Sequence, residues 1–144
     1  MFKRRILLAE DDGDDQRFFN EFLKDRKDII LMPSADDGEE LFKILGNIDK
    51  TGDLPNLIIL DQNMPKMTGK ESLVFLKETP RYKDISVIIY STYQVKDFFL
   101  SCRELGALDV VSKPDTIQSY RDMIGGFIAA KESPTPPPSP SSAI

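Results

Sequence analysis

Residues Leu57-Ile58-Ile59-Leu60-Asp61-Gln62-Asn63-Met64-Pro65 join an apolar run of four residues directly to a polar segment. An apolar residue at every position, rather than at alternate positions, is typical of a parallel strand that is covered on both faces. Four more short runs of this kind occur along the chain, at residues 6–9, 29–32, 85–90 and 107–111. The sequence therefore predicts five strands.

The segments between and after these runs have apolar residues at helical spacing. The stripes are Phe18, Phe19, Phe22 and Leu23; Leu41, Ile44, Leu45 and Ile48; Leu73, Val74 and Leu76; Val95, Phe98, Phe99 and Cys102; and Ile117, Tyr120, Ile124, Phe127 and Ile128. Alternating strands and helices favour an α/β fold with right-handed crossovers. We therefore predict a flavodoxin-like, doubly wound (βα)5 fold whose five-stranded parallel sheet has the order 2-1-3-4-5.

Charge and composition limit the chemistry that this chain can perform. It has 144 residues, with 19 Lys and Arg against 24 Asp and Glu, and a formal net charge of -5. Because binding to a phosphate backbone depends on clustered Lys and Arg, we expect no nucleic-acid partner. With one cysteine, Cys102, and no histidine, the chain excludes an intrachain disulfide, a Cys/His zinc site and a Ser-His or Cys-His catalytic pair. Carboxylates, hydroxyls and lysines remain.

The distribution of proline predicts one folded domain followed by a tail. Half of the ten prolines lie in the last twelve residues, together with several serines. This composition is typical of a disordered or polyproline segment, so we predict a domain at 1–131 and a Pro/Ser-rich disordered tail at 132–144. The apolar run after the basic N-terminus is too short for a signal peptide, and no stretch is long enough to span a membrane. We expect a cytoplasmic protein without a membrane partner.

Polar side chains follow four of the five expected strands. Glu10 and Asp11 follow the first, Asp61 the third, Ser91 the fourth and Lys113 the fifth. In an open parallel sheet, ligands bind beyond the carboxyl ends of the strands, near the point where the strand order reverses. Because the first and third strands are neighbours in the order 2-1-3-4-5, these residues are expected to share one edge of the sheet.

Carboxylates that meet in a cleft repel one another unless protons or a cation compensate their charge. Magnesium prefers oxygen ligands, so Glu10, Asp11 and Asp61 suit it, whereas the absence of histidine and thiol ligands disfavours zinc. Each residue alone also has a simpler interpretation.

Asp12, Asp14 and Asp15 are expected to cap and solvate a helix N-terminus. Asp36, with Glu39 three residues later, is expected to form the capping box of the second helix. Ser91 and Thr92 also suit the start of the fourth helix, and an isolated lysine such as Lys113 is by default a surface residue. The evidence for a site is the placement of the polar residues at four strand ends.

The ordered set of these motifs resembles the receiver domain of two-component response regulators across residues 1–131. The resemblance rests on Glu10-Asp11-Asp12 after an apolar run, on Asp61-Gln62-Asn63-Met64-Pro65 with Gly69 following, on Ser91, and on Lys113-Pro114. It implies that Asp61 accepts a phosphoryl group from a sensor histidine kinase or a histidine phosphotransfer protein. It also implies that Ser91 and Lys113 contact the phosphoryl oxygens.

The resemblance implies a magnesium site as well. Asp11 and Asp61 would hold Mg²⁺ directly with the backbone carbonyl of Asn63, and Glu10 would act through water. The Lys113-Pro114 peptide bond would be cis, as in the family. Phosphoryl transfer depends mainly on positioning and charge stabilisation, which the metal and Lys113 would supply.

The sequence departs from the family pattern at two positions. Val110 stands three residues before Lys113, where many members have an aromatic switch residue, and Tyr90 and Tyr93 are the aromatic residues near Ser91. How phosphorylation is coupled to output is therefore open. Thr92 stands where members often have Ala or Gly, so we expect slower self-hydrolysis of the acyl phosphate than in a Thr92→Ala variant.

The leading hypothesis is a stand-alone, chemotaxis-regulator-like receiver with no enzymatic activity beyond self-phosphorylation and self-dephosphorylation. Its output would be a protein contact through the face of the fourth helix, fifth strand and fifth helix, in a monomer or weak dimer. The kinase, the downstream partner and the stimulus are not identified.

Three alternatives remain beside this hypothesis. A phosphorylation-independent scaffold of the same fold is disfavoured by the complete residue set. An aspartyl-nucleophile phosphohydrolase would need a general-acid Asp where this chain has Asn63. A flavin-binding module would need a first loop rich in N–H donors rather than an acidic one.

Overall fold

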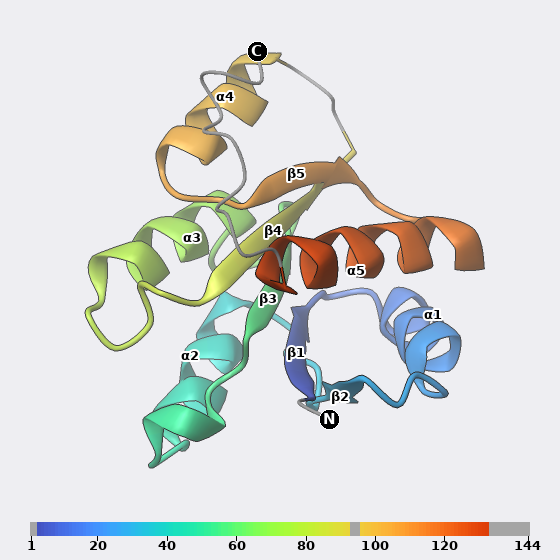
Figure 1. Ribbon diagram of the computed structural model, residues 1–144. Helices are drawn as coiled ribbons and strands as arrows, with labels where there is room; N and C mark the ends of the chain where they lie inside the picture. The colour runs from blue at the N-terminus through green and yellow to red at the C-terminus, as the bar shows by residue number, and fades with distance from the viewer. Residues whose placement is uncertain (1–2, 93–95, 133–144) are drawn as a thin grey trace. The chain divides into compact units, whose positions relative to one another are not determined.

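The computed structural model of the protein describes residues 3–92 and 96–132 (Figure 1). These residues belong to two compact units that divide after Lys113. The first unit contains the sheet and four α-helices, and the second contains the helix α5 (Ile117–Glu132). The expected limits of domain and tail, 1–131 and 132–144, stay a prediction, since residues 133–144 lie outside the described residues.

The first unit alternates strands and helices along the chain, as expected. Its elements are β1 (Arg4–Ala9), α1 (Gly13–Leu23), β2 (Ile29–Leu31), α2 (Gly38–Gly46), a 3-10 turn η1 (Thr51–Asp53), β3 (Leu57–Asp61), α3 (Gly69–Glu78), β4 (Ser86–Ser91), α4 (Lys96–Glu104) and β5 (Asp109–Ser112). The last strand begins two residues later than its apolar pattern predicts, at Asp109 rather than Ala107. Every other strand lies within two residues of its expected limits.

The five strands form one parallel sheet in the order β2-β1-β3-β4-β5, which confirms the predicted flavodoxin-like topology. The register pairs Ala9 of β1 with Leu60 of β3, and Asp61 of β3 with Tyr90 of β4. Ser91 in turn lies opposite Ser112 of β5. Because the strands are parallel, the residues that follow them meet at one edge of the sheet.

Side chains on the two faces of the sheet alternate along each strand, because successive residues of a strand point in opposite directions. Leu7 and Ala9 belong to the buried cluster that β1, β3 and β4 form with α2, α3 and α4. Ile6 and Leu8 are equally buried on the opposite face, the side on which Figure 1 shows α1. Both faces are covered, which explains the uninterrupted apolar runs.

The helix stripes are buried or half-buried with three exceptions. One of them is Ile117 at the start of α5, which is 44% exposed. Phe18 of α1 is 44% exposed and stacks on Phe22, because it lies to the side of the buried pair Phe19 and Leu23. Val95 lies outside the described residues. Cys102 is fully buried, and burial raises the pKa of its thiol, as expected for a packing residue.

The helix caps confirm one expectation and correct another. Asp12 caps α1, since its side chain accepts hydrogen bonds from the backbone N–H groups of Asp14 and Asp15. The cap of α2 is Asp37 rather than Asp36, and its side chain accepts the backbone N–H of Glu40 at 2.8 Å. The expected capping box of Asp36 and Glu39 was therefore wrong, and the cap lies one residue later, because the backbone of Asp37 takes the extended conformation that precedes the first helical turn. Among the described residues, no helix is long and apolar enough to cross a bilayer.

Candidate functional site

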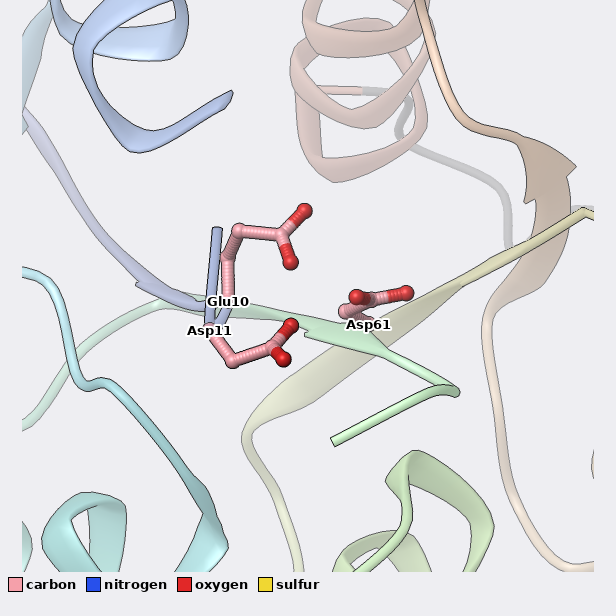
Figure 2. A group of neighbouring side chains, drawn as sticks. All are labelled: Glu10, Asp11 and Asp61. Atoms are coloured by element: carbon pink, nitrogen blue, oxygen red, sulfur yellow. The ribbon is translucent and has the colours of Figure 1, made fainter. Parts of the chain in front are cut away.

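The carboxyl ends of β1 and β3 bring three carboxylates together. Glu10 and Asp11 follow β1, and Asp61 is the last residue of β3. One carboxylate oxygen of each lies within 4.8 Å of the other two. Figure 2 shows the three side chains directed into the same space from the two strand ends. The structure thus places together the three acidic residues that the sequence singled out.

Burial makes the electrostatics of this cluster unusual. Glu10 is fully buried and Asp61 is 3% exposed, whereas Asp11 is open to solvent. Burial raises the pKa of the Glu10 carboxyl, and a hydrogen bond to Asp61 raises it further, so that it reaches about 8 despite the nearby Lys113. An ordinary glutamate has a pKa of roughly 4.3. Carboxylates crowded in this way need a compensating proton or cation.

Lys113 supplies positive charge to the cluster from the end of β5. Its Nζ atom lies 2.7 Å from Glu10 Oε1, 2.9 Å from Asp15 Oδ2 and 3.5 Å from Asp61 Oδ2. Burial lowers the pKa of Lys113, but the hydrogen bonds to Glu10 and Asp15 and the charge of Asp61 outweigh burial and raise it above its usual value. The ammonium is therefore charged at neutral pH.

Asn63 in the loop after β3 and Ser91 at the end of β4 are the further expected residues near Asp61. Ser91 is 4% exposed and follows Tyr90, the register partner of Asp61. The backbone N–H of Asn63 donates to Asp61 Oδ1 at 3.4 Å. Thr92 is exposed immediately after Ser91, so its effect on self-hydrolysis stays a prediction. Tyr90 is 2% exposed, which supports its interpretation as a core residue, and Tyr93 lies outside the described residues.

The loop between β3 and α3 is held close to the backbone of Asp61. The N–H of Gly69 donates to the carbonyl of Gln62 at 3.3 Å, and the side chain of Gln62 accepts the N–H of Lys70 at 2.8 Å. A Cβ atom at Gly69 would lie 2.8 Å from the carbonyl oxygen of Asp61. Thr68 and Glu71 form a capping box that starts α3 at this point. Only glycine permits this close approach.

Two residues at the site were missed by the sequence analysis. Asp15 was interpreted as part of a solvated helix N-terminus, but its carboxylate pairs with Lys113, which is 98 residues away in the sequence. Gln16 donates from Nε2 to the carbonyl of Glu10 and to Asp36 Oδ1, so it ties the end of β1 to the segment before α2. The spacing of apolar residues carries no signal for contacts between distant polar side chains. The sequence indicated only that Asp15 and Gln16 are polar residues near the start of a helix.

The residues fit a hard divalent cation and leave one expectation wrong. Three carboxylate oxygens within 4.8 Å of one another, two of them on buried residues, form a set of oxygen ligands that Mg²⁺ or a similar cation prefers. The Lys113-Pro114 bond, by contrast, is trans, since the described residues contain no cis peptide bond. The trans form of such a bond is favoured by about 0.5–1 kcal/mol unless the surroundings select the cis form.

Comparison with known proteins identifies the family. The model of the response regulator receiver domain matches residues 6–124 of this chain. The chain therefore belongs to the receiver domain family and is a receiver-domain response regulator of two-component signalling.

Its relatives include proteins of similar length and much longer ones. Response regulator Rcp1 of Synechocystis sp. is 33% identical over 129 residues, which cover 85% of this chain and 84% of the relative. Two-component response regulator ORR5 of Oryza sativa subsp. japonica is 32% identical over 109 residues, which cover 76% and 77%. The protein-glutamate methylesterase/protein-glutamine glutaminase of Bacillus licheniformis is 32% identical over 127 residues. This match covers 83% of the chain but only 33% of that relative, so the chain spans about a third of its length.

Solved structures agree with this assignment. The crystal structure of the Mn(2+)-bound form of response regulator Rcp1 has a TM-score of 0.72 and 30% sequence identity, and covers 94% of this chain and 99% of that one. The structure of the phosphorylated cyanobacterial phytochrome response regulator RcpA has a TM-score of 0.74 and 26% identity, and covers 92% and 99%. The likeness extends over nearly the whole of both neighbours.

Proposed function

We propose that this protein accepts a phosphoryl group on Asp61 from a sensor histidine kinase or a histidine phosphotransfer protein, in a Mg²⁺-dependent reaction. The observation that carries the proposal is the carboxylate of Asp61, nearly buried at the end of β3 and 3.5 Å from the ammonium of Lys113. Glu10 and Asp11 lie within 4.8 Å of it. The match to the receiver family and the phosphorylated state of the neighbour RcpA support this assignment.

The transfer requires little covalent chemistry from the protein. A carboxylate oxygen of Asp61 forms the new P–O bond as the P–N bond to the donor histidine breaks. The leaving nitrogen keeps the bonding electron pair, and with a proton on its other ring nitrogen the histidine becomes a neutral imidazole. Lys113 and the hydroxyl of Ser91 contact the oxygens of the transferred group and stabilise their charge.

Asp11, Asp61 and the backbone carbonyl of Asn63 would hold the cation directly, and Glu10 would act through water. When bound, a divalent cation supplies positive charge to the phosphoryl oxygens. The acidic cluster and the Mn(2+)-bound form of the neighbour Rcp1 support this part of the proposal. Without a cation, the role of Lys113 is to reduce the repulsion among the carboxylates.

The signal would leave the protein through contact with a downstream protein. The expected contact surface of α4, β5 and α5 and the expected cytoplasmic location stay predictions. Val110 is a buried core residue of β5, so a rotating aromatic side chain does not operate at that position. The proposal includes no enzymatic activity on external substrates, and the methylesterase activity in the relatives' names belongs to proteins about three times as long.

Intact-protein mass spectrometry tests the proposal directly. The wild-type protein is incubated with acetyl phosphate, with and without MgCl₂, alongside Asp61→Asn. We expect one phosphoryl adduct in the wild type that depends on magnesium and is absent from Asp61→Asn. Asp25→Asn is the matched control because Asp25 is exposed in the turn after α1 and the substitution is chemically the same.

The remaining outcomes separate this proposal from the alternatives. An adduct that persists in Asp61→Asn would move the acceptor to another residue. No adduct on a folded wild type, either from acetyl phosphate or from a phosphorylated histidine phosphotransfer protein, would favour the phosphorylation-independent scaffold. Continuous release of phosphate from a phosphomonoester would favour the phosphohydrolase.

A further inference from the structure

Asp15 gives the site a fourth carboxylate that the proposed phosphoryl chemistry does not use. It lies in the first turn of α1, and its Oδ2 atom is 2.9 Å from Lys113 Nζ. Both side chains are partly buried, at 29% and 24% exposure. The contact links the start of α1 to the end of β5, across the part of the sheet where Asp61 lies.

The geometry at Lys113 sets up a competition for its N–H groups. An ammonium has three donors, and the two short contacts, at 2.7 Å and 2.9 Å, go to Glu10 and Asp15. The distance to Asp61 is 3.5 Å, which is longer than the 2.7–2.9 Å of a charge-assisted hydrogen bond. Lys113 is therefore held toward the β1 end of the site and away from the residue that would carry the phosphoryl group.

We propose that Asp15 is a positioning residue that competes with the phosphoryl oxygens on Asp61 for the ammonium of Lys113. Phosphorylation places new anionic oxygens within reach of Lys113, which then exchanges Asp15 for the phosphoryl group. The lost contact between Lys113 and Asp15 offsets part of the stabilisation that Lys113 gives to the phosphoryl group. This inference rests on the proposed function, and it predicts that removing the charge of Asp15 strengthens binding of a phosphoryl group.

Titration calorimetry with beryllofluoride, a non-covalent phosphoryl mimic, tests this inference in the presence of MgCl₂. We expect Asp15→Asn to bind beryllofluoride about two- to fivefold more tightly than the wild type, the range that a partly exposed ion pair can account for. Asp14→Asn is the matched control, since Asp14 lies in the same helical turn but is 71% exposed and pairs with Arg17. We expect its affinity to stay within about twofold of the wild type, because charges of high exposure are well screened.

A second titration, with MgCl₂ alone, separates competition from a structural effect. If Asp15 merely shaped the loop that carries Asp11, Asp15→Asn would change the affinity for magnesium as much as that for beryllofluoride. If Asp15 competes for Lys113, Asp15→Asn changes the affinity for beryllofluoride. Its affinity for magnesium then equals that of the control variant Asp14→Asn. Circular dichroism confirms that each variant is folded.

The outcomes distinguish failure of this inference from failure of the proposed function. In one outcome the wild type binds beryllofluoride, with binding abolished in Asp61→Asn, while Asp15→Asn binds it no more tightly than the wild type. This result would overturn the competition and leave the proposed function standing. Parallel changes in magnesium and beryllofluoride affinity would also overturn it. No beryllofluoride binding by the wild type would overturn both proposals together.

Discussion

Individual residues at the site are constrained by charge and by the close packing of one backbone segment against another. Lys113 keeps three carboxylates within reach of one ammonium, and Gly69 lets the start of α3 approach the carbonyl of Asp61. The first constraint sets the electrostatics of the acceptor, and the second sets its position. Both depend on atoms that are far apart in the sequence or hidden in the backbone.

The backbone contact at Gly69 predicts a cost for any side chain there. In Gly69→Ala the new Cβ would lie 2.8 Å from Asp61 O and 3.0 Å from Gln62 Cα, and backbone atoms cannot rotate away. We expect the variant to lose roughly 1–3 kcal/mol of unfolding free energy. We also expect slower phosphorylation, because the new side chain displaces the end of β3, where Asp61 lies, and the loop that follows it. Urea denaturation and the rate of adduct formation measure the two effects.

Gly46 provides the matched control for that experiment. It is the last residue of α2, and a Cβ there would meet nothing within 4 Å. Gly46→Ala should therefore leave phosphorylation unchanged and stabilise the helix by roughly 0.5–1 kcal/mol. Equal stability of Gly69→Ala and the wild type would contradict the close approach seen in the structure.

At the scale of elements, strand ends and helix starts do most of the positioning. The ends of β1, β3, β4 and β5 carry the site residues, and the caps Asp12 and Asp37 hold the helices that begin next to them. The carboxylate of Asp37 also lies 3.6 Å from Lys66 Nζ, in the loop that follows Asp61. Capping of α2 is thus linked to the acceptor loop.

Asp37 predicts a pH-dependent contribution to stability. The hydrogen bond from the Glu40 N–H lowers the pKa of Asp37, outweighing burial, and the charge of Lys66 lowers it further. Because the pKa in the folded state lies below the unfolded value of about 3.9, ionised Asp37 stabilises the fold above that value. This contribution is lost as the pH falls through the pKa of the folded state.

We expect Asp37→Ala to cost about 0.5–2 kcal/mol of unfolding free energy at neutral pH, as for other helix caps. Asp37→Asn keeps a capping oxygen, so it should cost less, and its difference from the wild type should shrink as the pH falls through the lowered pKa of Asp37. Urea denaturation at several pH values measures both variants. The difference in unfolding free energy between Asp37→Asn and the wild type could instead stay constant down to acidic pH. That result would show that the charge of Asp37 does not stabilise the fold.

At the scale of the whole molecule, the acidic site is expected to couple cation binding to stability. Three carboxylates in one place destabilise the fold in the absence of a cation, and a cation that binds only the folded state stabilises it. At a magnesium concentration of about one hundred times Kd, the gain is about 2.7 kcal/mol. For a chain of this size we expect a rise in Tm of roughly 5–10 °C.

Thermal unfolding with and without MgCl₂ checks this coupling, and chelation by EDTA should reverse it. Asp11→Asn should largely remove the rise in Tm, because Asp11 is one of the proposed ligands, whereas Asp25→Asn should retain it. An equal rise in both variants would place the cation elsewhere. CaCl₂ in place of MgCl₂ tests whether the site discriminates between the two cations.

Much of the fold and site could be predicted from the sequence, because local patterns are direct physical signals. Uninterrupted apolar runs, such as residues 57–60, indicate strands buried on both faces, and helical stripes indicate the layers that cover them. The alternation of these elements indicated a doubly wound sheet, and for the flavodoxin-like order of its strands Glu10, Asp11 and Asp61 were expected at a shared edge. The structure confirmed that order and that cluster.

Tertiary structure alone determined the contacts that join distant segments. The pairing of Asp15 with Lys113, the close approach of Gly69 to Asp61 and the choice of Asp37 over Asp36 as a cap each depend on exact backbone positions. Phe18 likewise lies beside the buried face of α1 rather than on it. Sequence periodicity specifies which face of an element is apolar, but the distance between two polar atoms is set only when the elements have packed.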